Sequence, residues 1–92
     1  MALSGQKTVT TADTAVQLGT QNIGCSLLIK ALDTNTGIVA LGNDGANDVS
    51  LSTGLRLEPA NVIVLEYVGN LASLWLDSAV DGEGVSWIVL SA

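Results

Sequence analysis

The sequence contains no histidine, one cysteine and only three basic residues, Lys7, Lys30 and Arg56. Without histidine, the chain has no Ser–His or Cys–His nucleophile pair and no zinc site of the usual nitrogen-and-sulfur type. One thiol cannot form an internal disulfide, and we expect Cys25 to be a small buried hydrophobic residue. Phosphate binding needs a cluster of lysine and arginine, so the sequence predicts no nucleic-acid partner.

Long apolar runs are also missing. The longest uninterrupted runs, such as residues 62–65, are far shorter than the roughly 20 residues that a membrane-spanning helix needs. Residues 1–11 lack the basic start and the long apolar stretch of a secretory signal. We therefore expect no membrane partner, and a protein that works where it is made or leaves inside a larger assembly.

Hydrophobic residues, in contrast, are abundant. They make up 48% of the 92 residues, against 13% that are charged, and the mean hydropathy is +0.48. A domain of this size has much surface for its volume, so some apolar side chains must stay outside or be covered by another chain. The sequence thus predicts an oligomer or a docked protein. Its net charge of −6 favours solubility and would also suit a basic patch on a partner.

Apolar and polar residues alternate with a period of two along much of the chain, which indicates β-strands. Residues 49–57 show the clearest alternation, whereas residues 62–68 are apolar on both faces, which predicts a strand covered on both sides. No helix of ten or more residues is predicted. The predicted strands are residues 7–11, 15–18, 26–32, 38–41, 49–57, 62–68, 72–77 and 85–90.

Turn signals separate these segments at intervals of roughly eight to twelve residues, the spacing typical of a sandwich or barrel. Residues 33–37 (DTNTG) predict a hairpin connection, and residues 58–61 (EPAN) place the only proline where a turn is needed. We expect one domain, residues 1–92, folded as an all-β, compact antiparallel β-sandwich of jelly-roll type, with a small barrel as the alternative. Residues 1–11 would be available as an extended N-terminal arm.

The stretch VDGEGVSW, residues 80–87, places Asp81 and Glu83 among glycines. A general acid and base would need a cleft and perturbed pKa values, which a loop tip rarely offers, so a hairpin turn is the favoured interpretation. Asp44 and Asp48 resemble a calcium loop only faintly, because the regular ligand spacing is missing. We expect no cofactor and no catalytic or metal site; ion binding by residues 42–48 stays open.

The two tryptophans differ in their surroundings. Trp75 lies on the more polar side of its predicted strand, and tryptophan is enriched at interfaces, although partial burial explains it equally well. Trp87 shares a face with Val85 and Val89 and is expected in the core.

Several motifs follow a recurring plan. The chain has a Thr/Val start (TTADTAVQL), a strand that leads into an N-T-G turn (IKALDTNTGIVALG), a G-x-x-L-x-P stretch, and a final acidic glycine turn (AVDGEGVSWIVL). In this pattern of strands and turns the sequence resembles small structural proteins of tailed bacteriophages, which decorate the head or sit on the virion. One departure is Ala60, where a glycine after the proline is more usual, which leaves the turn type open.

The resemblance implies a non-enzymatic capsid decoration or cement protein on the outer head surface. Its partners would be copies of itself, with a homotrimer favoured, and the phage major capsid protein. It would be made in the host cytoplasm and located in the virion. The alternative is a tail, baseplate or fibre-associated adaptor, or a host-glycan-binding module.

Contacts between protomers would bury the apolar second faces of the strands. An edge strand or residues 2–11 would be available to extend a partner's sheet. The predicted interface residues are Trp75, Leu28, Leu32, Val39, Leu41, Ile63 and Leu65.

Overall fold

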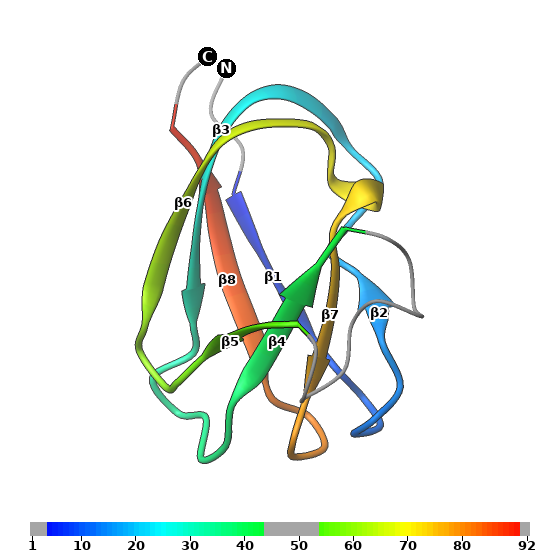
Figure 1. Ribbon diagram of the computed structural model, residues 1–92, viewed down its shortest axis with the longest axis vertical. Coiled ribbons are helices and arrows are strands. Elements are labelled where there is room, and N and C mark those ends of the chain that lie inside the picture. The colour runs from blue at the N-terminus through cyan, green and yellow to red at the C-terminus, as the bar shows by residue number, and fades with distance from the viewer. Residues whose placement is uncertain (1–3, 44–53, 91–92) are drawn as a thin grey trace.

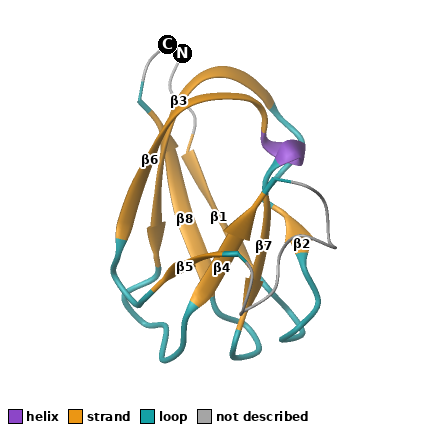
Figure 2. Cartoon of the chain, in the orientation of Figure 1, coloured by secondary structure: helices purple, strands orange, loops and turns teal. Residues whose placement is uncertain are grey.

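Two four-stranded antiparallel sheets lie face to face in the computed structural model (Figure 1), which describes residues 4–43 and 54–90. Sheet A has the strand order β1-β8-β3-β6, and sheet B has the order β2-β7-β4-β5. The strands are β1 (Ser4–Thr8), β2 (Val16–Gln17), β3 (Asn22–Ala31), β4 (Val39–Gly42), β5 (Leu55–Leu57), β6 (Val62–Asn70), β7 (Trp75–Ser78) and β8 (Gly84–Val89). A short 3-10 turn, η2 (Leu71–Ser73), precedes β7 (Figure 2).

This connectivity confirms the predicted fold. The chain alternates between the sheets at nearly every connection, and the resulting eight-strand, two-sheet order is that of a jelly roll. Each predicted strand overlaps an observed one, although residues 49–53 of the fifth lie outside the described residues. Within residues 4–43 and 54–90, no helix has the length and apolar character to cross a membrane.

The predicted hairpins at residues 33–37 and 80–87 are wrong in one respect. The turns reverse the chain, but β3 and β4 belong to different sheets, and so do β7 and β8. Among the described strands, only β4 and β5 are sequence neighbours that pair with each other. Turn residues set the change of direction, whereas the pairing partner depends on which faces must be buried together.

The core lies between the sheets and takes the inward faces of the strands. On β3 every second residue, Leu27, Ile29 and Ala31, is fully buried. Trp87 is only 6% exposed, which confirms its predicted place in the core, and the partly buried Cys25 packs against the same cluster. The other buried hydrophobic residues of the cluster are Val9, Leu18, Val39, Leu41, Leu57, Val68, Leu71, Leu74, Leu76, Val85 and Val89.

Strand β6 departs from its prediction. Val62 and Val64 are each 52% exposed, so this chain does not cover the strand on both sides. In the pairing with β3, Leu65 lies opposite Leu27 and Val68 lies opposite Cys25, so β6 has one extra residue there. This β-bulge turns both Leu65 and Val68 toward the core and breaks the simple alternation.

The turn at residues 58–61 settles the question raised by Ala60. The backbone N–H of Asn61 donates to the carbonyl oxygen of Glu58 at 3.0 Å. Ala60 has a φ of +69° at the third position of this turn, behind Pro59. A positive φ after a proline defines a type II turn, which glycine occupies more easily than alanine.

Candidate interaction surfaces

The outer face of sheet A carries an apolar patch formed by Leu28, Val62, Val64, Ile88 and Leu90. Leu28 on β3 lies opposite Val64 on β6 and Ile88 on β8, so three apolar side chains form a row across three strands. Val64 is 52%, Ile88 43% and Leu90 50% exposed. We call these five residues the outer patch.

Polar residues surround the outer patch. On one side lies β1, where the outward-facing Ser4 pairs with Ile88 and Gln6 pairs with Ser86. At one end Lys30 lies opposite Val62, and its Nζ atom is 3.1 Å from a carboxylate oxygen of Asp33. An apolar centre with a polar rim is the usual anatomy of a protein–protein contact.

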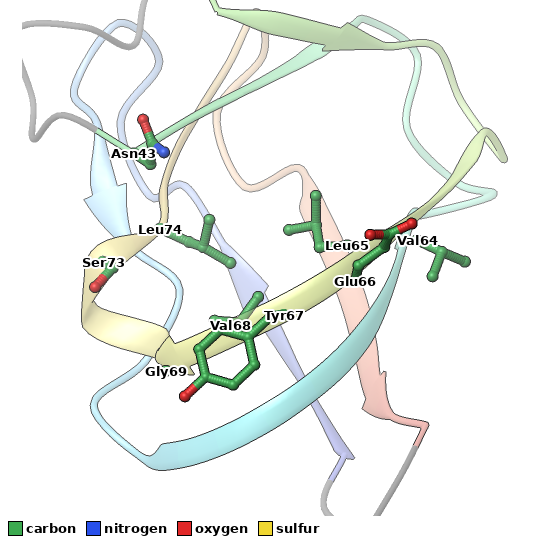
Figure 3. Close-up of a pocket in the computed structure, with 9 residues that line it drawn as sticks. All are labelled: Asn43, Val64, Leu65, Glu66, Tyr67, Val68, Gly69, Ser73 and Leu74. Atoms are coloured by element: carbon green, nitrogen blue, oxygen red, sulfur yellow. The ribbon is translucent and has the colours of Figure 1, made fainter.

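A cleft runs along the free edge of β6 (Figure 3). Its volume is about 500 Å³, and one wall is formed by residues 64–69 of β6. Asn43, Ser73 and Leu74 complete its lining. A smaller hollow of about 170 Å³ shares Asn43, Leu65 and Leu74 with the cleft and adds Leu41, Gly42 and Leu55. Four of the six residues that line the hollow are leucines, and Glu66 is the one charged residue among the described residues that line the cleft and the hollow.

Four turns form a region that is more polar than the outer patch. They are residues 10–14, 33–37, 58–61 and 79–83, and we call them the turn end. Asp81 accepts a hydrogen bond at one carboxylate oxygen from the backbone N–H of Ala12 at 2.7 Å. Glu83 accepts hydrogen bonds from the backbone N–H and the hydroxyl of Thr36, at 2.7 and 3.0 Å, and from the N–H of Gly37 at 3.1 Å. Each carboxylate therefore ties residues 79–83 to a different neighbouring turn.

These contacts determine the acidity of Glu83. Partial desolvation alone would raise its pKa, but the hydrogen bonds from the N–H groups of Thr36 and Gly37 and from the Thr36 hydroxyl lower the pKa below its ordinary value. A carboxylate held in its ionised form by its own chain is suited to structure and is a poor proton donor at neutral pH.

Gly84 ends this turn and lies deep in the structure. Asn35, only 6% exposed, donates its side-chain amide N–H to the Gly84 carbonyl at 2.8 Å and accepts from the Gly84 N–H at 3.3 Å. A Cβ atom on Gly84 would overlap the carbonyl oxygen of Lys7 on β1. A side chain larger than hydrogen is therefore excluded here by the approach of two strands.

The structure gives the acidic residues no shared site. Asp81 and Glu83 bond to separate turns, as described above. Over residues 4–43 and 54–90, no group of three His, Cys, Asp or Glu side chains is close enough to hold a metal ion. Asp44 and Asp48 lie outside the described residues.

The structure does not bring the seven predicted interface residues together. Leu28 lies in the outer patch, and Leu32 is half-buried just after β3. Val39 and Leu41 are 0% and 4% exposed and belong to the core, so neither lies on an exposed face of its strand, although Leu41 contributes to the lining of the small hollow. This corrects the assignment for those two residues.

The remaining three are spread over both sheets. Ile63 and Leu65 are partly buried and pack against the core, because they occupy the inward face of β6. Trp75 is half-buried on β7 in sheet B, where it pairs with Gln17 and Gly42.

Sequence reasoning missed the exposed residues of β6 and β8. A signal was present: Glu66 shares the period-2 phase of Val62 and Val64, and a charged residue marks the solvent side of a strand. Tyr67, at 72% exposure the most exposed large hydrophobic residue described, follows directly in the bulge. Bulges are not visible in a regular alternation, so its position could not be inferred.

No family model and no curated protein matches the sequence. Among solved structures, the chain is similar to the coat protein dimer of Tobacco streak virus, with a TM-score of 0.45, 13% identity, and 98% of this chain and 85% of that chain covered. A second structure of that coat protein gives a TM-score of 0.44 at 13% identity, with 99% and 85% covered. Similarity at this level assigns neither an activity nor a partner to the chain.

Proposed function

We propose that the chain is a non-enzymatic structural protein of a virion, and specifically a decoration or cement protein on the outer surface of a bacteriophage capsid. The outer patch is the observation that carries this proposal. A row of exposed apolar side chains across three strands is unfavourable in water, and large exposed apolar patches mark interaction sites. Jelly rolls also recur among viral capsid domains.

The energetics favour many weak contacts over one strong contact. Burying a whole aliphatic side chain contributes about 1.5–3 kcal/mol. The four outer-patch residues with measured exposures of 43–52% would thus contribute about 1 kcal/mol each. Association itself costs about 4–15 kcal/mol, so one patch gives a weak complex. Repetition on a lattice converts such contacts into stable binding through avidity.

In this proposal the outer patch is buried between copies of the chain, with a trimer favoured, and the trimer binds the major capsid protein. Light scattering of the purified protein tests the first part, with an expected mass three times the 9.4 kDa of the chain. Val64→Lys places a charge in the patch and should give the monomer mass. Thr10→Lys adds the same charge at an exposed site of the turn end and should leave the trimer intact.

Binding to purified, undecorated phage heads tests the second part. We expect saturable binding, with a copy number fixed by the symmetry of the lattice, and heads that withstand higher temperature once decorated. Val64→Lys should lose this binding, and Thr10→Lys should retain it. Heads that take up neither the original chain nor the control at any concentration would contradict the cement role.

A second candidate function is a tail, baseplate or fibre-associated adaptor, or a module that binds host glycans. Tyr67 favours it, because the exposed ring stands beside a cleft with hydrogen-bonding groups on Asn43, Glu66 and Ser73. Sugars stack on such rings while their hydroxyls bond to neighbouring polar groups. A glycan array with the original chain and Tyr67→Ala separates this function from cement: signal on the array that Tyr67→Ala abolishes supports glycan binding.

A further inference from the structure

We propose that the free edge of β6 is a strand-addition site, which accepts an extended segment of a partner chain with alternating apolar and basic residues. Strand β6 is nine residues long and, among the described residues, pairs only with β3. An edge strand presents unpaired backbone N–H and C=O groups, to which another chain can add in register. This inference goes beyond the virion role, since the site does not require the partner to be a capsid protein.

The other edge strands have features that hinder the addition of a further strand, and β6 lacks these features. Strand β2 has two residues and β5 has three, with Arg56 at its centre. Strand β1 has five residues and includes Lys7. Short length and positive charge are the usual means of blocking an edge, and β6 has neither, nor a proline. Its bulge lies between Leu65 and Val68, within the part of β6 that lines the cleft, so the regular edge open to an incoming strand is residues 62–65.

The cleft beside β6 has the shape that strand addition needs. Six consecutive β6 residues, 64–69, form its wall, so the backbone edge itself faces the space. Leu65 and Leu74 line both the cleft and the adjoining hollow, and Leu55, 51% exposed, lies at the far side. In this mode of recognition the backbone bonds supply affinity, and pockets for every second side chain supply specificity. The hollow would take one apolar side chain of the incoming strand.

The charge around the cleft indicates which kind of partner segment would bind there. Glu66 is the one charged residue among those described around the cleft, and the chain as a whole has a net charge of −6. A strand with lysine or arginine on the face away from the hollow would meet complementary charge. A second copy of this chain would bring another strongly acidic surface to the same place, which favours a basic partner segment over self-pairing.

Two short blocked peptides test the site on the full-length protein. One alternates valine and lysine; the other alternates valine and glutamate. Backbone amide NMR should show shifts confined to residues 62–70 and the cleft lining, with slower amide exchange along β6, when the lysine peptide binds. A lysine peptide with N-methylated backbone nitrogens at alternate positions should bind at least about tenfold more weakly, because it lacks the donors for a β-ladder.

Substitutions on β6 and on β1 test whether the peptide binds at the free edge of β6. Glu66→Lys, at an exposed site, should weaken the lysine peptide about tenfold and reverse the preference toward the glutamate peptide. Gln6→Lys on β1, the opposite edge of sheet A, adds one unit of positive charge away from the cleft and should leave the preference between the two peptides unchanged. Equal binding of the N-methylated peptide, equal preference for both charges, or shifts centred on Ile88 and Leu90 of the outer patch would overturn the site.

A separate measurement tests whether the added strand comes from a basic partner segment or from a second copy of this chain. Protection of β6 amides that grows with the concentration of the chain alone, and that persists in the Val64→Lys variant whose outer patch no longer associates, would assign the edge to a second copy and overturn the proposal of a basic segment. Head binding is measured separately, so loss of the cement role would not affect this result. Peptide binding that fails while heads are still decorated would remove the strand-addition site alone.

Discussion

The turn end and the outer patch use the composition of this chain in opposite ways. At the turn end Asp81 and Glu83 bond to backbone groups of the same chain, so their charges serve internal structure. On the outer patch Val64 and Ile88 stay half-exposed, and each lies opposite Leu28 across the sheet. The two carboxylates therefore stabilise the fold, and the aliphatic side chains form the candidate interaction site.

Gly84→Ala should have the largest effect on stability, because residue 84 directly follows the last segment of the turn end. The new methyl group would meet the Lys7 carbonyl, and we expect a loss of about 3 kcal/mol in the free energy of unfolding, measured by urea denaturation. Gly82→Ala is the matched control in the same loop, with a φ of +81° but open space around it. It should lose only about 1 kcal/mol. Equal losses would show that β1 and β8 can move apart to accept the methyl group, and that close approach does not set the requirement for glycine at residue 84.

Glu83 should give the turn end an acid-sensitive component. Its pKa is lowered in the folded state, so the stability it contributes is present above the pKa of the unfolded chain and is lost as pH falls through the folded pKa. Melting temperature measured from neutral pH into the acid range should fall less steeply for Glu83→Gln than for the original chain. Glu58→Gln, exposed at another turn, should keep the original slope. Parallel slopes for both variants would remove Glu83 as the source.

Ala60→Gly should strengthen the turn end slightly. Relief of the left-handed backbone at alanine gains about 1 kcal/mol, part of which is offset by the greater freedom of glycine in the unfolded chain. We expect a net gain of about 0.5 kcal/mol in the free energy of unfolding. Ala72→Gly, in η2 and without a positive φ, should lose stability instead. A loss at residue 60 would contradict the type II turn.

Val64→Thr should change stability least, by less than about 0.5 kcal/mol, because the side chain is exposed and threonine suits a strand. Self-association in sedimentation velocity should nevertheless weaken. Val85→Thr makes the same substitution at a fully buried position of β8 and should lose about 2 kcal/mol. Similar losses at both positions would mean that Val64 serves the core rather than a partner.

The sequence was sufficient for the strands but not for their partners. Alternation and turn residues located all eight segments, because period-2 burial and glycine-rich turns are local properties. Residues 33–37 and 80–87 were misassigned as hairpins, because a turn between paired strands and a turn between sheets use the same residue types. Long-range burial decides between them.

The candidate surfaces were harder to predict, for reasons visible in β6. Four adjacent apolar residues, 62–65, give no preference for either face, and the bulge then shifts the phase before Val68. Within β6, only the charged Glu66 indicates which face of the strand is exposed to solvent. The role of Asn35 was equally hidden, since its two bonds to Gly84 span a sequence separation of 49 residues.

The pairing of β1 with β8 has a consequence for the order of events during synthesis. Among the described strands β1 pairs with β8 alone, so β1 cannot take its place in the sheet until β8 has left the ribosome. Until then sheet A lacks two of its four strands, and the residues of sheet B that pack against β8 stay exposed. Sheet A is therefore expected to close only after β8 has been synthesised, and nascent copies that emerge close together would be at risk of exchanging β1.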